Sequence, residues 1–231
     1  MDRFVPNLDD CNGNFPPVEH ALSSPNGLLA WGGDLSPHTL LSAYSRGIFP
    51  WYGRNDPILW WCPAPRTVIF PDQLHISRRF ARDIRGYRWR AHLNRDFAGV
   101  IRRCAQPRPR QPETWITPEM ITAYCRLHAL GYAQCLEVEI DGQLAGGIYG
   151  VTLGGVFFGE SMFSTRTNGS KLALKVLCDT LLHNRYHLLD CQLPSTHLRR
   201  MGAVELPLRS FRALLPRSDI HQPKPLVLPG Q

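Results

Sequence analysis

The sequence predicts an α+β protein in which helices pack on a mixed but mostly antiparallel sheet. Three observations lead to this prediction. Residues 134–163 alternate apolar and polar side chains with a period of two, and turns fall at Asp141-Gly142 and Gly154-Gly155. A long helical segment follows at residues 165–184, and a short buried strand, HLLDCQL, begins at residue 187. A meander, a helix and a returning strand are typical of this class.

The segments before the meander predict short helices and one strand. Residues 1–35 are rich in turn formers and show little periodicity. Ser36-Pro37 combines an N-cap with a proline in the first turn, so we expect a helix that ends near Gly47. Residues 49–65 place two tryptophan-containing clusters among four prolines, which is too broken for a helix and too aromatic for a linker.

The middle of the chain contains further capping signals. Ser77 predicts a short helix to Gly86, and the alternation at residues 87–93 predicts a strand. Asn94 or Asp96 can begin the next helix, and Thr117-Pro118 begins one that ends at Gly131. The remaining segments are a polar, Pro-rich loop at residues 106–113 and, after residue 193, small helices followed by a Pro-rich tail.

Length and composition predict a globular protein. The chain has 231 residues, of which 43% are hydrophobic and 19% charged, and no apolar run reaches the roughly 18–20 residues of a membrane span. The N-terminus does not have the pattern of a secretory signal. Seven cysteines are scattered without a CxxC pair, which indicates reduced thiols. We therefore expect a cytoplasmic protein without membrane association.

Positive charge is concentrated in one segment. The net charge is +7, and residues 78–110 contain eleven arginines against Asp83 and Asp96. Arginine donates two parallel hydrogen bonds to phosphate, and a positive field raises the encounter rate with a polyanion. A solvated basic surface is an equal alternative on charge alone. Trp89 within the run favours nucleic acid.

Three polar side chains interrupt apolar strands. Asp190 and Gln192 lie two residues apart and point to one face of a short strand, while Cys191 points to the other. Glu160 follows the apolar run VFFG. The carboxylates of Asp190 and Glu160 each either have a hydrogen-bonding partner within the protein or bind a polar group of a ligand. His183 and His187 have the spacing of zinc ligands, but Asn184 replaces the glutamate of the metalloprotease motif, so we expect no metal.

A set of long sequence motifs gives a more specific prediction of the function and the domain organisation. The segments NGLLAWGGDLSPHTLLSAYSRGIFPWY, DPILWWCPAPRTVIFPDQLHISR, ETWIT, GGIYGV, FFGESMFS, NGSKLAL and LLDCQL occur in this order and span most of residues 25–205. The chain resembles the leucyl/phenylalanyl-tRNA–protein transferases in these motifs. The resemblance implies a small N-terminal α+β domain at residues 1–64 and a catalytic domain similar to GNAT-type acetyltransferases at residues 65–231.

The resemblance also implies an activity. Members of this family transfer Leu, Phe or Met from aminoacyl-tRNA to the N-terminal Arg or Lys of a protein, which marks that protein for degradation by the N-end rule. The aminoacyl ester is already activated, so no cofactor or metal is expected. The enzyme must align an amine with the ester carbonyl, remove a proton and stabilise an oxyanion.

By resemblance, Asp190 and Gln192 form the catalytic pair. Because an amide is a very poor base, we expect Gln192 to orient the amine while Asp190 polarises it or accepts charge. A relay through both residues is an alternative. Asp190 could instead bind the basic side chain of the acceptor.

The remaining site residues follow from the same resemblance. Trp51 and Trp115 match the tryptophans that hold the terminal adenosine of the tRNA. Arginines of the basic run then bind the tRNA backbone by shape and phosphate; the expected residues are Arg78, Arg79, Arg82 and Arg85. The expected pocket for the amino-acid side chain consists of Ile148, Phe157, Met162, Leu174, Leu177 and Leu189, with Glu160 on its rim.

Two other functions compete with this one. An acyl-CoA-dependent N-acetyltransferase shares the expected fold, but residues 164–171 lack the Gly-rich loop that binds pyrophosphate. A non-catalytic tRNA-binding protein would account for the arginines and tryptophans, but it would leave Asp190, Gln192 and Glu160 without a role.

Overall fold

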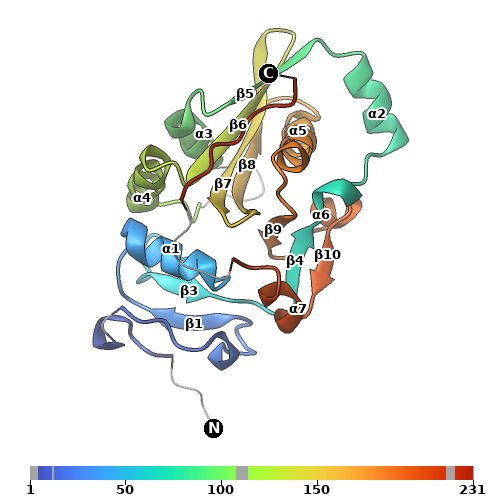
Figure 1. Ribbon diagram of the computed structural model, residues 1–231. Coiled ribbons are helices and arrows are strands. Elements are labelled where there is room, and N and C mark those ends of the chain that lie inside the picture. Colours follow the sequence, from blue (N-terminus) through green and yellow to red (C-terminus); the bar gives the residue numbers. More distant parts are fainter. Residues whose placement is uncertain (1–4, 12, 108–113, 217–221, 231) are drawn as a thin grey trace.

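The computed structural model describes residues 5–11, 13–107, 114–216 and 222–230. Within these ranges the chain forms a three-stranded and a seven-stranded sheet flanked by helices (Figure 1). The small sheet has the order β1-β3-β2 and the large one the order β10-β4-β9-β8-β7-β6-β5. Strands β8 and β9 are parallel, and the other paired strands are antiparallel. The predicted α+β class with a mixed, mostly antiparallel sheet is confirmed.

The strands and helices have the following bounds. The strands are β1 (Leu28–Trp31), β2 (Phe49–Pro50), β3 (Leu59–Trp61), β4 (Arg66–Ile69), β5 (Trp89–Leu93), β6 (Ala133–Ile140), β7 (Gln143–Leu153), β8 (Val156–Ser164), β9 (Leu188–Gln192) and β10 (Val204–Leu206). The α-helices are α1 (Pro37–Ser45), α2 (Arg78–Arg85), α3 (Phe97–Cys104), α4 (Pro118–Ala129), α5 (Gly169–His183), α6 (Thr196–Arg200) and α7 (Leu208–Arg212). Short 3-10 turns are η1 (Asp9–Cys11), η2 (Val18–His20) and η3 (Pro71–Gln73).

The predicted helix starts are confirmed by their caps. In each of four helices the capping side chain accepts a hydrogen bond from the backbone N–H three residues later, as an N-cap does. The caps are Ser36, Ser77, Asp96 and Thr117. Of the two residues proposed to open α3, Asp96 is therefore the cap.

The large sheet separates two apolar clusters. Helices α1, α3 and α4 pack on one face, in a cluster that also contains the small sheet. Helix α5 packs on the other face, in a cluster that includes Phe80 of α2. Figure 1 shows α5 beside the central strands on the side away from α3 and α4, with α1 between the small sheet and the large one. Alternate residues of β9 divide between the clusters, because Leu188 lies in the first and Leu189 in the second.

Strands β8 and β9 pair over only part of their length. Their register runs from Val156–Leu188 to Phe158–Asp190, whereas β8 itself continues to Ser164. On its other side, β9 pairs with β4 from Leu189 to Gln192, with Thr67 opposite Gln192. Polar side chains of β8 and β9 can therefore meet where the two backbones are no longer hydrogen-bonded to each other.

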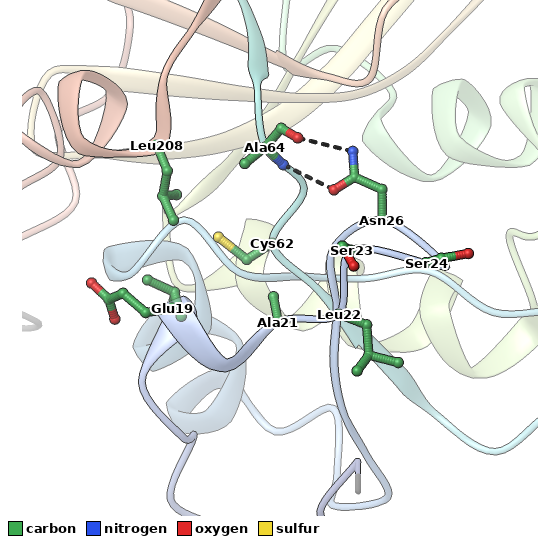
Figure 2. Close-up of a pocket in the computed structure, with 10 residues that line it drawn as sticks. Glu19, Ala21, Leu22, Ser23, Ser24, Asn26, Cys62, Ala64 and Leu208 are labelled. Atoms are coloured by element: carbon green, nitrogen blue, oxygen red, sulfur yellow. Dashed lines mark hydrogen bonds between the residues drawn. The ribbon is translucent and has the colours of Figure 1, made fainter. Parts of the chain in front are cut away.

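The side chain of Asn26 forms hydrogen bonds between the N-terminal segment and the residues just before β4. Asn26 donates from Nδ2 to the Ala64 carbonyl at 3.0 Å and accepts from the Ala64 N–H at 3.4 Å (Figure 2). A cavity of about 640 Å³ lies beside this contact, with Cys62 and Leu208 in its wall. None of its lining residues belongs to the polar cluster around Glu160 described below.

Strand β10 is not predicted from the sequence, which indicates only helices and a tail in that region. It pairs with β4 and ends the sheet. Parts of two predicted segments, residues 108–113 of the loop and residues 217–221 and 231 of the tail, lie outside the described residues. No helix in the described ranges has both the length and the apolar character to cross a bilayer.

Candidate active site

Glu160 of β8 lies at the centre of a buried polar cluster. Tyr44 of α1 donates from its hydroxyl to Glu160 Oε1 at 2.7 Å, and Tyr124 of α4 donates to Oε2 at 2.9 Å. Gln192 of β9 donates from Nε2 to Oε1 at 2.9 Å. Residues distant in the sequence thus converge on one carboxyl group where β8 and β9 diverge.

Burial raises the pKa of the Glu160 carboxyl to about 7, although the three hydrogen bonds from Tyr44, Tyr124 and Gln192 oppose the rise. The two tyrosine hydroxyls also lie 2.5 Å apart. If both donate to a charged Glu160, neither has a proton left for this contact. A proton on Glu160 supplies the missing one and completes a ring of three hydrogen bonds. The geometry therefore agrees with a carboxyl group that takes up a proton near neutral pH.

Gln192 connects this cluster to the end of β9. Its donation to Glu160 fixes the orientation of the amide, and among the hydrogen bonds of the described residues none uses Gln192 Oε1. Its backbone is in the left-handed region at φ 64°, which is unfavourable for a residue other than glycine. A strained backbone next to an unused acceptor is typical of a binding or catalytic position.

Asp190 holds that backbone in place. Its Oδ1 accepts the Gln192 N–H at 2.9 Å and Arg66 Nε at 2.8 Å, and its Oδ2 accepts Arg66 Nη2 at 2.7 Å. Neither side chain of this ion pair has any exposed surface. In this structure Asp190 thus contacts Gln192 directly and is bound by Arg66 on both oxygens. Its carboxylate is already occupied by a basic side chain, which argues against its binding a second one from an acceptor.

Arg66 lies between two aromatic rings. Its guanidinium is 4.7 Å from the centre of the Phe49 ring and 4.8 Å from that of Phe211. Burial opposes its charge, but Asp190 raises the pKa of Arg66. Phe49 comes from β2 and Phe211 from α7, so this contact ties the small sheet and the C-terminal helix to the Asp190–Gln192 strand.

The two predicted adenosine-binding tryptophans lie on neighbouring segments. Trp51 is 39% exposed and packs edge-to-face on Trp61. Trp115 is half-buried and precedes the Thr117 cap of α4. The side chain of Thr117 lies near the hydroxyl of Tyr52, which is next to Trp51, and it opposes the rise that burial causes in the pKa of Tyr52. The structure thus brings the two loops together beside α1 and α4, the helices that supply Tyr44 and Tyr124.

The predicted pocket residues divide between the two faces of the sheet. Six of them form or contact the apolar cluster under α5: Ile148, Phe157, Met162, Leu174, Leu177 and Leu189. Ile148 and Met162 are cross-strand partners, as are Phe157 and Leu189. Glu160 faces the tyrosines on the other side.

The predicted tRNA-binding arginines are solvent-facing. Arg78, Arg79, Arg82 and Arg85 are exposed on α2, while Phe80 anchors the helix. Other arginines of the run are engaged elsewhere, since Arg95 pairs with Glu137 and Glu139. Arg108 and Arg110 lie outside the described residues.

Three residues of the cluster were not predicted from the sequence: Arg66, Tyr44 and Tyr124. Arg66 has the clearest sequence signal, because a lone arginine in the apolar run RTVIF needs a buried partner. Tyr44 and Tyr124 lie on the apolar faces of their helices, where a tyrosine is ordinarily a packing residue. Only the three-dimensional position of Glu160 shows that their hydroxyls donate hydrogen bonds to a carboxyl group.

A buried, pKa-shifted carboxyl group bonded to an amide with an unused acceptor is the arrangement of an enzyme. Comparison with known proteins also indicates an enzyme and shows to which enzyme family the chain belongs. The chain belongs to the leucyl/phenylalanyl-tRNA–protein transferase family. The model of the "Leucyl/phenylalanyl-tRNA protein transferase" family matches residues 68–216, and that of its N-terminal domain matches residues 33–64.

Relatives with the name leucyl/phenylalanyl-tRNA–protein transferase match nearly the whole chain. The Chromobacterium violaceum protein is 50% identical over 211 residues, covering 91% of this chain and 90% of its own length. The Alkalilimnicola ehrlichii protein is 52% identical over 225 residues, covering 96% and 84%. Among solved structures, a GCN5-related N-acetyltransferase from Kribbella flavida has a TM-score of 0.38 and 12% identity, covering 74% of this chain and 61% of that one.

Proposed function

We propose that this protein transfers an amino acid from aminoacyl-tRNA to the N-terminus of an acceptor protein. The observation that carries the proposal is the family match over residues 68–216, which includes Glu160, Asp190 and Gln192. The names of the relatives supply the donor and the protein acceptor. We further propose Leu, Phe and Met as the transferred residues and N-terminal Arg or Lys as the acceptor, which would mark the product for N-end rule degradation.

The proposed reaction needs no cofactor, because the donor is already an ester. The acceptor α-amine, once it has lost its ammonium proton to solvent, attacks the ester carbonyl and forms a C–N bond. The C–O bond to the ribose then breaks. The amine gives up one further proton, and the ribose oxygen takes one, so the proton balance closes. Because an α-ammonium group has a pKa of about 8, the first proton is lost readily near neutral pH.

Gln192 is suited to position the amine. Its Nε2 is held by Glu160, so its Oε1 is available to accept a hydrogen bond from an amine N–H. We propose that Asp190 acts as a positioning residue through the Gln192 N–H, and that Glu160 fixes the amide orientation. Alignment of an amine with an ester carbonyl supplies much of the rate of such a transfer.

The apolar cluster under α5 offers an environment for the amino-acid side chain, next to the point where the pairing of β8 with β9 ends. An apolar pocket separates side chains by only about 1–3 kcal/mol per methylene, which allows Leu, Phe and Met to be accepted together. Trp51 and Trp115 would stack on the terminal adenosine, and the α2 arginines would contact the tRNA backbone.

The test uses leucyl-tRNA that carries labelled Leu, a peptide that begins with Arg and a control peptide that begins with Ala. The proposal requires label to move to the Arg peptide and the Gln192→Ala variant to lose this transfer. If tRNA binds but no label moves to either peptide, a tRNA-binding protein replaces the proposed enzyme.

Acetyl-CoA in place of leucyl-tRNA tests the acetyltransferase alternative. Backbone amides at the start of α5 are already occupied, since Gly169 N–H donates to the Arg166 carbonyl and Ser170 N–H to Ser164 Oγ. These two amides are therefore not available to a pyrophosphate. We expect no acetyl transfer.

A further inference from the structure

A second cavity, lined in part by charged and polar side chains, lies near the end of β9. Its volume is about 590 Å³, and α6 and the start of α5 contribute to its walls. The segment that joins η3 to α2 forms another wall, and its His75 N–H donates to the carbonyl of Met201, the residue after α6, at 3.0 Å. The lining residues are His75, Ser77, Phe80, Lys171, Thr196, His197, Arg200 and Met201.

The charge of this cavity is of one sign. Lys171, Arg200 and two histidines line it, and no carboxylate does. Elsewhere the described residues pair many of their cations, as with Lys175–Asp179 on α5 and Arg199–Glu205 at α6. Among the ion pairs of the described residues, none includes Lys171 or Arg200. The Lys171 ammonium instead faces the Phe80 ring, 6.0 Å from its centre.

The hydrogen-bonding groups of the cavity are mostly donors. Ser77 Oγ already accepts the Phe80 N–H at 3.2 Å, so its own O–H is left to donate. The Nε2 of His197 is buried and has no partner among the described residues. Burial lowers the pKa of His197, and the nearby charges of Lys171 and Arg200 lower it further. A bound anion would accept hydrogen bonds from Lys171, Arg200 and the Ser77 hydroxyl, and it would offset the mutual repulsion of the cations.

The chain places this cavity close to the proposed site. Thr196 follows Gln192 by four residues, so their Cα atoms are at most about 14 Å apart. The exposed Arg78 and Arg79 follow Ser77 directly. The wall of the cavity therefore contains residues close in sequence both to the end of β9 and to the α2 arginines.

We infer that this cavity binds a backbone phosphate of the tRNA near its 3′ end, through Lys171, Arg200 and the hydroxyl of Ser77. The inference rests on the proposed function, because it takes the donor to be a tRNA. The phosphate would fix the distance between the 3′ end and the helical stem. The exposed arginines of α2 would then strengthen the attraction for the tRNA backbone, but they would not fix the position of its 3′ end.

The test compares two donors. One is leucyl-tRNA, and the other is adenosine that carries a leucyl ester on its ribose and has no phosphate. For the Lys171→Gln/Arg200→Gln variant we expect the KM for leucyl-tRNA to rise about tenfold or more, with kcat/KM for leucyl-adenosine unchanged. The slope of log K against log salt for tRNA binding should decrease by about 0.7, because one phosphate is no longer neutralised. Lys175→Gln and Arg199→Gln, which remove charges just outside the cavity, serve as matched controls with changes below twofold.

A second readout does not depend on activity. Addition of a CCA trinucleotide should raise the pKa of His197, measured by NMR, and equimolar inorganic phosphate should do so less. An equal response to both would identify a general anion site and overturn the inference. So would wild-type KM and salt slope in the double variant. If the wild-type protein itself transfers Leu from neither donor, the proposed function fails, and the trinucleotide titration still decides whether the cavity binds a polynucleotide phosphate.

Discussion

Arg66 and Asp190 form a bidentate ion pair with no solvent-exposed surface, and Asp190 also accepts a hydrogen bond from the backbone N–H of Gln192. The pair joins β4 to β9 across 124 residues of sequence. Its burial makes the two side chains dependent on each other, because either charge alone would be left without a partner in an apolar environment.

Removal of one partner of this pair should therefore be strongly destabilising. Arg66→Met leaves the Asp190 charge buried and unpaired, and we expect the free energy of unfolding to fall by about 3–5 kcal/mol. Urea denaturation measures it. The Arg66→Met/Asp190→Leu double variant should recover part of the loss, since no charge remains buried. Equal losses in the single and double variants would contradict this account.

Gln192→Gly should separate activity from stability. Glycine relieves the left-handed backbone at φ 64°, which offsets removal of the hydrogen bond to Glu160, so we expect stability to change by less than about 1 kcal/mol. The kcat for aminoacyl transfer should fall by about 100-fold or more, because the amine is no longer oriented. Single-turnover kinetics and urea denaturation provide the two measurements. A variant with near-normal kcat would remove Gln192 from the reaction.

Glu160→Gln should change how stability depends on pH. The pKa of Glu160 rises from 4.5 to about 7 on folding, so the folded protein binds more protons than the unfolded chain between these values. Stability from this group therefore falls as pH rises from about 4.5 to about 7, by about 3 kcal/mol in total. Unfolding free energies of the wild type and the variant, compared at about pH 5 and pH 8, should show this difference. Parallel pH profiles would show that Glu160 does not titrate in this window.

Trp51→Ala should weaken donor binding. Stacking of one base on an aromatic side chain contributes about 1–3 kcal/mol, so we expect the KM for aminoacyl-tRNA to rise about 5- to 100-fold with a smaller change in kcat. Trp31, which is exposed to a similar extent (37% against 39%) but lies on β1, provides the control variant Trp31→Ala. A similar rise in KM for both variants would point to a general loss of structure.

Arg82→Glu/Arg85→Glu should weaken binding of all tRNAs alike. These side chains are exposed on α2, and phosphate contacts carry no sequence information. We expect leucyl- and phenylalanyl-tRNA to lose affinity by the same factor, about tenfold at moderate salt, as filter binding would show. The exposed Arg126 on α4 provides a control, because we expect the charge reversal Arg126→Glu to lack the effect of a single reversal at Arg82 or Arg85. A loss confined to one tRNA would contradict backbone recognition by α2.

Local signals in the sequence were sufficient for most elements of the fold. Ser36, Ser77, Asp96 and Thr117 each cap the helix that they predict, because capping involves atoms only three residues apart. The alternation of residues 134–163 likewise predicts β6, β7 and β8. Strand β10, by contrast, has three residues and depends on β4, which lies far earlier in the chain.

The polar cluster could be predicted only in part. Asp190, Gln192 and Glu160 are visible as polar residues in apolar strands. Their partners are not, since Tyr44 reaches Glu160 across 116 residues and Arg66 reaches Asp190 across 124. No periodicity relates residues so far apart. Only the packing of α1 against the sheet and the pairing of β4 with β9 bring them together.

The position of β4 has a consequence for biosynthesis. Both neighbours of β4 in the large sheet, β9 and β10, are translated after all the other strands of that sheet. At about 5–20 residues per second, roughly 6–24 seconds separate the synthesis of Ile69 from that of Leu188. During this interval both edges of β4 lack their final partners on the ribosome, where a chaperone has access to them. Chains that terminate before β9 therefore retain an unpaired Arg66 and never assemble the Asp190–Gln192 arrangement.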